Sequence, residues 1–197
     1  MSGAQPVWLQ TPLSEEQVRA LRIGELVHLS GDLYTARDEA HKRMQEACLQ
    51  GEPLPFDPAG QVIYYVGPTP AKPGRPIGSA GPTTASRMDP YAPLLIQRGL
   101  RGMIGKGRRS AEVRSAMQQH GCVYFGAVEG TAALLADCVK SAELVAYEDL
   151  DAEAIRRLVV ENFPVVVIND CLGGDLYEEG RQRYRRSRPG SSGLIPL

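Results

Sequence analysis

The sequence predicts an α/β domain with a mixed, partly parallel sheet. The length of 197 residues suits one domain. From Arg101 onward, strand-like and helix-like segments alternate, as in a largely parallel sheet covered by helices. The chain before Arg101 is richer in strands and more irregular, which is compatible with a mixed sheet or a small barrel-like half.

The first fifty residues predict two helices and one strand. Ser14 and Gln17 have the spacing of a capping box, so a helix is expected to begin there. Residues 26–30 alternate in hydrophobicity and are flanked by glycines, which predicts a strand followed by a turn at residues 31–32. Residues 36–51 predict a helix that ends at a glycine.

The middle of the chain predicts a strand, a loop and a helix. Residues 61–68 have a strand pattern, and residues 69–78 are too rich in Pro and Gly for regular structure. The next helix is expected to have Asp89 as its N-cap and Pro90 at its first position, and to end at Gly99.

The second half predicts regular alternation. Strands are expected at 100–107, 122–128, 142–150 and 163–170, and helices at 110–121, 130–139 and 151–161. The segment 181–197 is basic and then rich in Gly and Ser, which predicts a solvated, flexible tail. An arm that docks on nucleic acid or on a protein is the alternative for this tail.

Composition excludes several classes of partner. The net charge is −1, so no overall field draws the protein to nucleic acid or to an anionic membrane. The longest apolar run, 165–168, is far shorter than the ~20 residues of a membrane span. Residues 1–16 lack the basic and apolar regions of a signal peptide. We therefore expect a cytoplasmic protein with neither a membrane nor a nucleic-acid partner.

The four cysteines are spread along the chain at positions 48, 122, 138 and 171. No two have the C-x-x-C spacing of a zinc or cluster motif. So few cysteines in a chain of this length do not indicate a disulfide framework. Free, buried or partly buried thiols are expected.

The segment "GPTTASRMDP" suggests an anion site. Thr83, Thr84 and Arg87 precede a predicted helix, whose first N–H groups attract anions. The guanidinium of Arg87 adds a fork of donors that suits a carboxylate. The alternative is a turn in which the threonine hydroxyls cap the helix and Arg87 lies on the surface.

Two other cations are candidates for the same role. Lys106 lies between Gly105 and Gly107, which allow close approach of the backbone to a ligand. Arg37 shares a helix face with His41 and could bind a second carboxylate. The alternatives are an exposed lysine on a turn and an ion-paired start of a helix.

Polar residues also follow the last predicted strand. Asn169, Asp170 and Asp175 stand where sites of α/β proteins often lie. A structural turn in "GGDLY" is an equal alternative.

Taken together, six segments carry a resemblance that no single motif carries. They are "YTARDEAH", "GPTTASRMDPY", "GMIGKG", "VYFGAVEGTAALLA", "VAYEDLDAEAIRRL" and "FPVVVINDCLGGDLY". In this order they resemble the β subunit of class I iron–sulfur fumarate hydratases and of the related L-tartrate dehydratases. The resemblance covers residues 8–180 and leaves the tail 181–197 outside. It departs at Leu172 and Gly173, where family members often carry a charged or larger residue.

The resemblance implies a fold, a partner and a reaction. The fold is a swivelling β/β/α domain. The partner is an α subunit that holds a [4Fe–4S] cluster on three cysteines, with an open iron position for the substrate; this chain would hold no metal. The implied assembly is α2β2 or a homodimer of this chain. The reaction is reversible hydration of a C4 dicarboxylate, fumarate to L-malate. L-tartrate or a methylated C4 diacid as substrate, or a non-catalytic anion-binding module, are the alternatives.

The resemblance also assigns residues. Thr83 is the proton-transferring group, Thr84 and Arg87 contact the substrate, and Arg37 and Lys106 bind its carboxylates. Three cations suit two carboxylates and the charge that develops when a neighbouring proton is removed. A threonine is a weak base, so Thr83 would act as an alkoxide or in relay with an aspartate of the α subunit.

Overall fold

The computed structural model describes residues 5–127 and 132–184. The strands are β1 (Val7–Gln10), β2 (Leu26–Thr35), β3 (Val62–Tyr64), β4 (Gly102–Gly105), β5 (Val123–Gly126), β6 (Val139–Ala146) and β7 (Ile155–Asn169). The α-helices are α1 (Glu15–Ala20), α2 (Asp38–Gln50), α3 (Ala92–Gln97), α4 (Ala111–His120), α5 (Ala132–Asp137) and α6 (Leu176–Tyr184), and two 3₁₀ helices are η1 (Ala85–Met88) and η2 (Glu148–Glu153).

The strands form one sheet that closes on itself. The order is β1-β2-β3-β4-β5-β7-β6, and β2 also pairs with β7, so β2, β3, β4, β5 and β7 make a ring. Strands β1 to β5 pair in parallel, whereas β7 is antiparallel to β2, β5 and β6. The predicted α/β class with a mixed, partly parallel sheet is therefore confirmed.

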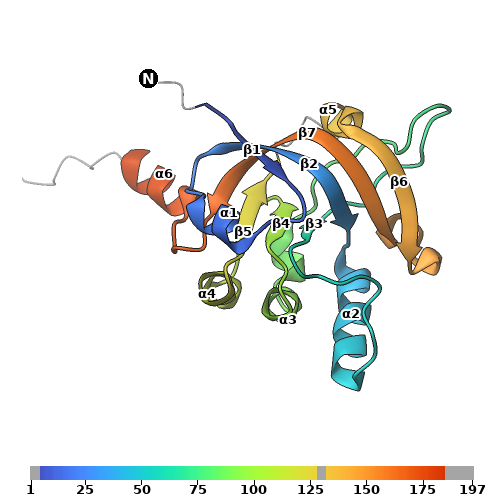
Figure 1. Ribbon diagram of the computed structural model, residues 1–197, viewed down its shortest axis with the longest axis horizontal. Coiled ribbons are helices and arrows are strands. Elements are labelled where there is room, and N and C mark those ends of the chain that lie inside the picture. Colours follow the sequence, from blue (N-terminus) through green and yellow to red (C-terminus); the bar gives the residue numbers. More distant parts are fainter. Residues whose placement is uncertain (1–4, 128–131, 185–197) are drawn as a thin grey trace, which may run out of the picture.

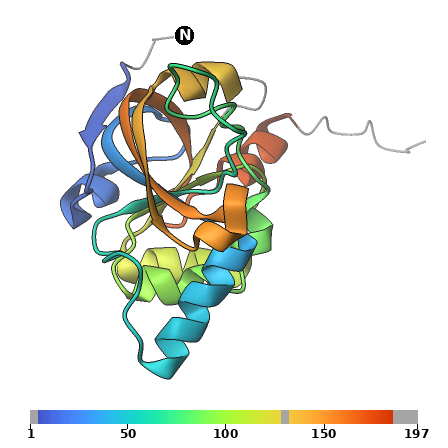
Figure 2. The ribbon, with the colours of Figure 1, turned by 90° about the vertical axis from the view of Figure 1, so that its right-hand side faces the viewer.

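Closure of the ring separates two hydrophobic cores. Along β3, the buried side chains alternate: Val62 and Tyr64 belong to one core, and Ile63 belongs to the other. The first core also holds residues of the facing strands, such as Phe125 and Phe163. The second lies under α2, α3 and α4, which gather on one side of the barrel, with α5 on the opposite side (Figures 1 and 2).

Several local predictions are confirmed. Ser14 and Gln17 form the capping box of α1. Gly51 ends α2 with φ +74°, and the Ser110 hydroxyl caps α4. The cysteines are free thiols, of which Cys122 and Cys171 are buried. No helix in the two described ranges has the length and apolar character of a membrane span.

The predicted helix at 151–161 is wrong, because residues 155–169 form the long strand β7. Ile155 and Leu158 are buried and three apart, which imitates a helical face. β7 pairs with β6 along one edge and with β2 along the other, so pairing on both sides overrides the local pattern. Where β7 faces β2, the register shifts and Asn162 has φ +55°, which marks a bulge.

Two smaller predictions are also wrong. β2 does not turn at residues 31–32 but runs through Gly31 to Thr35, with the bulge opposite. Asp89 does not cap α3; it ends η1, and α3 begins after Tyr91. Of the expected tail 181–197, residues 181–184 belong to α6, which ends at Tyr184. The rest of the predicted tail, 185–197, lies outside the described residues.

Candidate active site

The five predicted site residues lie where three neighbouring parallel strands end. Arg37 follows β2 by two residues, and Lys106 follows β4 directly. Thr83 is tied to the end of β3, because its N–H donates to the carbonyl of Tyr65 at 2.7 Å. Carboxyl ends of adjacent parallel strands share one edge of a sheet, which is where α/β proteins commonly bind ligands.

Backbone hydrogen bonds join the threonine turn to the glycine–lysine turn. Lys106 N–H donates to the Thr83 carbonyl at 3.1 Å, and Ala85 N–H donates to the Lys106 carbonyl at 2.8 Å. Thr84 and Lys106 form a parallel bridge. Segments 22 residues apart in the sequence are therefore joined into one hydrogen-bonded unit, in which Thr83, Thr84 and Lys106 lie together.

The threonine hydroxyls are not used to cap a helix. Thr84 is the N-cap of η1, yet its side chain makes no capping hydrogen bond. Neither the Thr83 nor the Thr84 hydroxyl bonds to a residue that the structure describes. The capping alternative for this turn is thus not observed, and both hydroxyls stand at a site edge without a structural task.

Arg37 and Arg87 meet at one carboxylate. Arg87 Nη2 lies 2.7 Å from Asp38 Oδ2, and Arg37 Nη2 lies 4.0 Å from the same oxygen and 3.3 Å from Glu153 Oε1. The ion-paired helix start expected as the alternative for Arg37 is therefore present. Arg87 is half exposed. Each guanidinium has five donors, so an ion pair leaves donors for a second anion.

Gly67, just beyond β3, fixes the place of Arg37. A Cβ built on this glycine would lie 2.8 Å from Arg37 Nη1 and 3.2 Å from the carbonyl oxygen of Ala152. Any larger residue would push the guanidinium away. In the sequence, Gly67 stands near the end of the strand-like segment 61–68 with no motif around it, so its role was not predicted.

His41 is buried and contacts the backbone of Arg37. Its Nδ1 lies 2.8 Å from the Arg37 carbonyl. A carbonyl only accepts, so Nδ1 carries the proton of the neutral ring. Burial lowers the pKa of His41 from 6.5 to about 4, against the opposing effect of that hydrogen bond. His41 thus positions the start of α2 as a neutral group.

A pocket of about 360 Å³ opens beside Lys106. Its lining residues are Thr84, Gly105, Lys106, Gly107, Gly126, Ala127 and Tyr177. Glycines supply much of the wall, so backbone groups border the space. Tyr177 comes from α6, a helix that the sequence analysis did not predict, and is a site residue that it missed.

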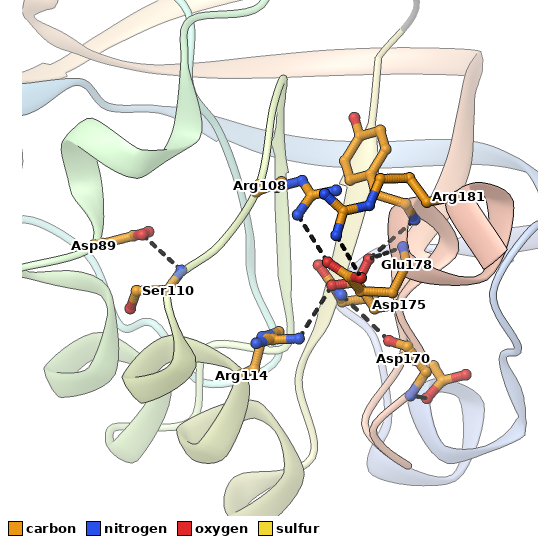
Figure 3. A network of polar contacts seen from close by, with 11 residues as sticks. Asp89, Arg108, Ser110, Arg114, Asp170, Asp175, Glu178 and Arg181 are labelled. Atoms are coloured by element: carbon orange, nitrogen blue, oxygen red, sulfur yellow. Dashed lines mark hydrogen bonds and ion pairs between the residues drawn. The ribbon is translucent and has the colours of Figure 1, made fainter. Parts of the chain in front are cut away.

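Helix α6 is fastened to the site by charge pairs (Figure 3). Arg108, next to the glycine–lysine turn, pairs with Glu178 at 2.7 Å, and its guanidinium lies 5.9 Å from the centre of the Tyr177 ring. Arg114 of α4 pairs with Asp175 at 3.1 Å. The wall that carries Tyr177 is therefore held by contacts from two elements.

The polar residues after β7 have structural tasks. Asp175 Oδ1 accepts the N–H groups of Tyr177 and Glu178, so Asp175 begins α6. The carboxylate of Asp170 accepts N–H groups from Ile23, Leu172 and Gly174, and Asn169 donates to the Gly174 carbonyl at 3.2 Å. Of the two readings of this segment, the structural turn is the one observed.

The described residues do not suit an iron–sulfur cluster. Among them, no three His, Cys, Asp or Glu side chains lie close enough together to hold a metal ion. Burial also raises the pKa of the Cys122 thiol to about 12, which opposes the thiolate form that iron requires. A cluster that serves this site would need ligands from elsewhere.

Comparison with known proteins gives a consistent family. The sequence profile described as "Fumarase C-terminus" matches residues 1–180. Fumarate hydratase 1, mitochondrial, of Leishmania major is 42% identical over 153 residues, which are 77% of this chain and 28% of that protein. The anaerobic class I fumarate hydratase of Escherichia coli K12 is 38% identical over 180 residues, 89% of this chain and 33% of that protein.

A shorter relative matches over nearly its whole length. A Methanocaldococcus jannaschii protein with the provisional name L(+)-tartrate dehydratase subunit beta is 38% identical over 173 residues, 85% of this chain and 89% of that protein. This chain spans about a third of the length of the fumarate hydratases that it matches.

Proposed function

Because this chain belongs to the family of fumarase C-terminal domains, we propose that it is the β-type half of an iron–sulfur hydro-lyase. The proposed reaction is reversible hydration of fumarate to L-malate. The observation that carries the proposal is the fused unit of Thr83, Thr84 and Lys106, with Arg37 and Arg87 at the neighbouring strand end. This arrangement supplies several cations for the two carboxylates of a dicarboxylate.

In the proposed mechanism, cations hold the two carboxylates. Lys106 provides a point charge beside the pocket, and Arg87 provides a fork of donors at the open edge. Removal of a proton next to a carboxylate moves negative charge onto its oxygens. Cations that are already in place stabilise this charge without rearranging during the reaction. Asp38 and Glu153 hold the arginine side chains in position before substrate binds.

Thr83 is the proposed proton-transferring group. Its backbone is fixed by hydrogen bonds to Tyr65 and Lys106, while its hydroxyl is not engaged by any described residue. A fixed backbone with an uncommitted hydroxyl suits a group that must reach a substrate atom reproducibly. The weak basicity of a hydroxyl requires a second acid or base, which we assign to an aspartate of the partner.

The partner in this proposal is an α subunit that carries a [4Fe–4S] cluster on three cysteines. The motive is chemical: the described part of this chain offers no ligand set for a cluster. The site edge formed by Thr83, Arg87 and Lys106 would then face the α subunit. An α2β2 assembly in the cytoplasm is part of the same proposal.

L-tartrate is a second candidate substrate. The relative named as a tartrate dehydratase subunit is as similar to this chain as the Escherichia coli fumarate hydratase, at 38% identity. Both substrates are C4 dicarboxylates, so the cations described above suit either one. Residues of the partner would decide between them.

The test is co-expression with the cysteine-bearing partner under anaerobic conditions, followed by assays on fumarate, L-malate and L-tartrate. Interconversion of fumarate and malate supports the proposal, and dehydration of tartrate alone selects the second candidate. If a stable complex with an intact cluster acts on none of these substrates, nor on methylated C4 diacids, the chain is better described as a non-catalytic anion-binding module. Binding of succinate to the chain would then be measured by calorimetry.

A further inference from the structure

Arg109 is a fully buried arginine that none of the proposed chemistry uses. Its side chain has no exposed surface. Nε donates to Asp89 Oδ1 at 2.7 Å, and Nη1 donates to the Tyr65 hydroxyl at 3.0 Å. The other oxygen of Asp89 accepts the N–H of Ser110, the N-cap of α4, at 2.8 Å (Figure 3).

The contacts of Arg109 lead to both turns of the site. Its guanidinium lies 5.2 Å from the ring centres of Tyr65 and of Tyr124. The carbonyl of Tyr65 accepts the N–H of Thr83 at 2.7 Å. The hydroxyl of Tyr124 donates to the carbonyl of Gly107 at 3.0 Å. One tyrosine thus holds the threonine turn and the other holds the glycine–lysine turn.

We propose that Arg109 is a positioning residue that fixes the threonine turn and the glycine–lysine turn at one separation. It does so through Tyr65 and Tyr124, and the inference rests on the proposed function of these turns. Thr83 and Lys106 act on one substrate molecule, so a shift of one turn against the other misplaces the proton-transferring hydroxyl relative to the carboxylate. Misplacement by about 1 Å costs as much as 10²-fold in rate.

The shape of the guanidinium explains why an arginine occupies this place. Arg109 uses Nε and Nη1 in different directions at the same time, and presents a flat face to two rings. A lysine would keep the charge and reach one partner. Burial raises the pKa of Tyr65 and of Tyr124, so both hydroxyls stay protonated and keep these hydrogen bonds near neutral pH.

The first experiment removes one hydroxyl. Tyr124→Phe keeps the ring against Arg109 and deletes the hydrogen bond to the Gly107 carbonyl. Thr11→Val is the matched control, since the Thr11 hydroxyl also donates to backbone carbonyls, those of Ser30 and Asp32, but lies away from the site. Hydrogen exchange on the full chain is measured at the amides of Ala85 and Lys106, which join the two turns. We expect exchange there at least tenfold faster in Tyr124→Phe and unchanged in Thr11→Val.

The second experiment replaces the arginine. Arg109→Lys is compared with Arg101→Lys, because Arg101 is a partly buried arginine that donates to the carbonyls of His120 and Gly121 at the other end of β4. In the complex with the partner, we expect kcat to fall about 10²-fold in Arg109→Lys. Arg101→Lys should keep kcat even where it lowers the melting temperature. In Tyr124→Phe we expect a fall in kcat of about tenfold with a stable fold.

The outcomes separate a positioning role from a structural one. If both lysine variants lose melting temperature equally and keep kcat, or if exchange at Ala85 and Lys106 is unchanged in Tyr124→Phe, the inference is wrong. If the wild-type complex has no activity on any C4 diacid, the proposed function fails. The exchange measurement still decides whether Arg109 and Tyr124 hold the turns together.

Discussion

At the scale of single residues, the backbone of Thr83 has a structural role, whereas its hydroxyl is assigned a chemical one. Its N–H donates to the Tyr65 carbonyl, its carbonyl accepts the Lys106 N–H of the other turn, and its hydroxyl bonds to no described residue. Thr83→Val should therefore leave the fold and substrate binding largely intact. A well-placed general base contributes about 10²–10⁴ in rate, so kcat of the complex should fall by this amount. A near-normal kcat with a raised KM would mean that Thr83 only helps to bind a carboxylate.

Arg87 should respond differently to a conservative change. Arg87→Lys keeps the positive charge and a contact with Asp38 but loses the fork of donors. Both KM and kcat of the complex should worsen, with kcat/KM lower by about 10–10². Arg43→Lys is the control, because Arg43 also forms a surface ion pair, with Asp149. Equal kinetics for the two variants would remove Arg87 from the site.

His41 makes stability depend on pH. Its pKa is about 4 in the folded chain against 6.5 when unfolded. The unfolded chain therefore binds the proton first, and stability is lost as pH falls from about 6.5 to 4, by at most on the order of 3 kcal/mol. His41→Asn keeps a donor for the Arg37 carbonyl and does not titrate. Its urea midpoint should fall less between pH 7 and 5 than that of the wild type. Parallel curves of urea midpoint against pH for His41→Asn and the wild type would contradict the assignment.

Residues of the site could be predicted only where a short local motif marks them. Thr83, Thr84 and Lys106 stand in short motifs with glycine or proline beside them, and the structure places them together. Arg109 and Tyr177 could not be recognised. An arginine before a helix is usually exposed, and this one is buried by long-range packing against residues such as Asp89, Tyr65 and Tyr124.

At the scale of elements, termini were predicted better than elements made by long-range pairing. Ser14, Gly51 and Ser110 act through neighbours a few residues away, and each was placed correctly. β7 depends on partners far away in the sequence, such as Leu26, which pairs with Val166, 140 residues later. A pattern read within one segment does not contain that pairing, and so residues 151–161 were predicted as a helix.

Helix α6 divides the C-terminal segment into two parts with different expected roles. Deletion of residues 185–197 should change the melting temperature little, because their composition is basic and rich in Gly and Ser. Deletion from Asp175 onward also removes Tyr177 and two ion pairs, that of Glu178 with Arg108 and that of Asp175 with Arg114 of α4. A chain of this length loses about 2–4 °C per kcal/mol, so several degrees should be lost. Equal melting temperatures for both deletions would show that α6 contributes nothing to stability.

At the scale of the whole molecule, closure of the sheet positions the site. The ring brings the ends of β2, β3, β4 and β5 to one edge, while the two cores make the barrel and its helices rigid. A largely parallel sheet is expected from Arg101 onward, but there only β4 and β5 pair in parallel, whereas β6 and β7 pair antiparallel. A small barrel-like half is one of the two arrangements expected before Arg101. The observed ring also includes β7, because β2 pairs with both β3 and β7, and this long-range pairing is not contained in the local pattern.

This chain should have no hydro-lyase activity without its partner. Its four thiols are separate, and no described group of three side chains could bind iron. The chain purified without a partner should therefore be colourless, show no absorption of an iron–sulfur cluster in the visible range, and form no malate from fumarate. After reconstitution with the partner, the brown colour should follow the partner on separation of the subunits under anaerobic conditions. A brown preparation of this chain alone would show that this chain holds the cluster, contrary to the proposal. Malate formation by a colourless preparation would show that the reaction does not need the cluster.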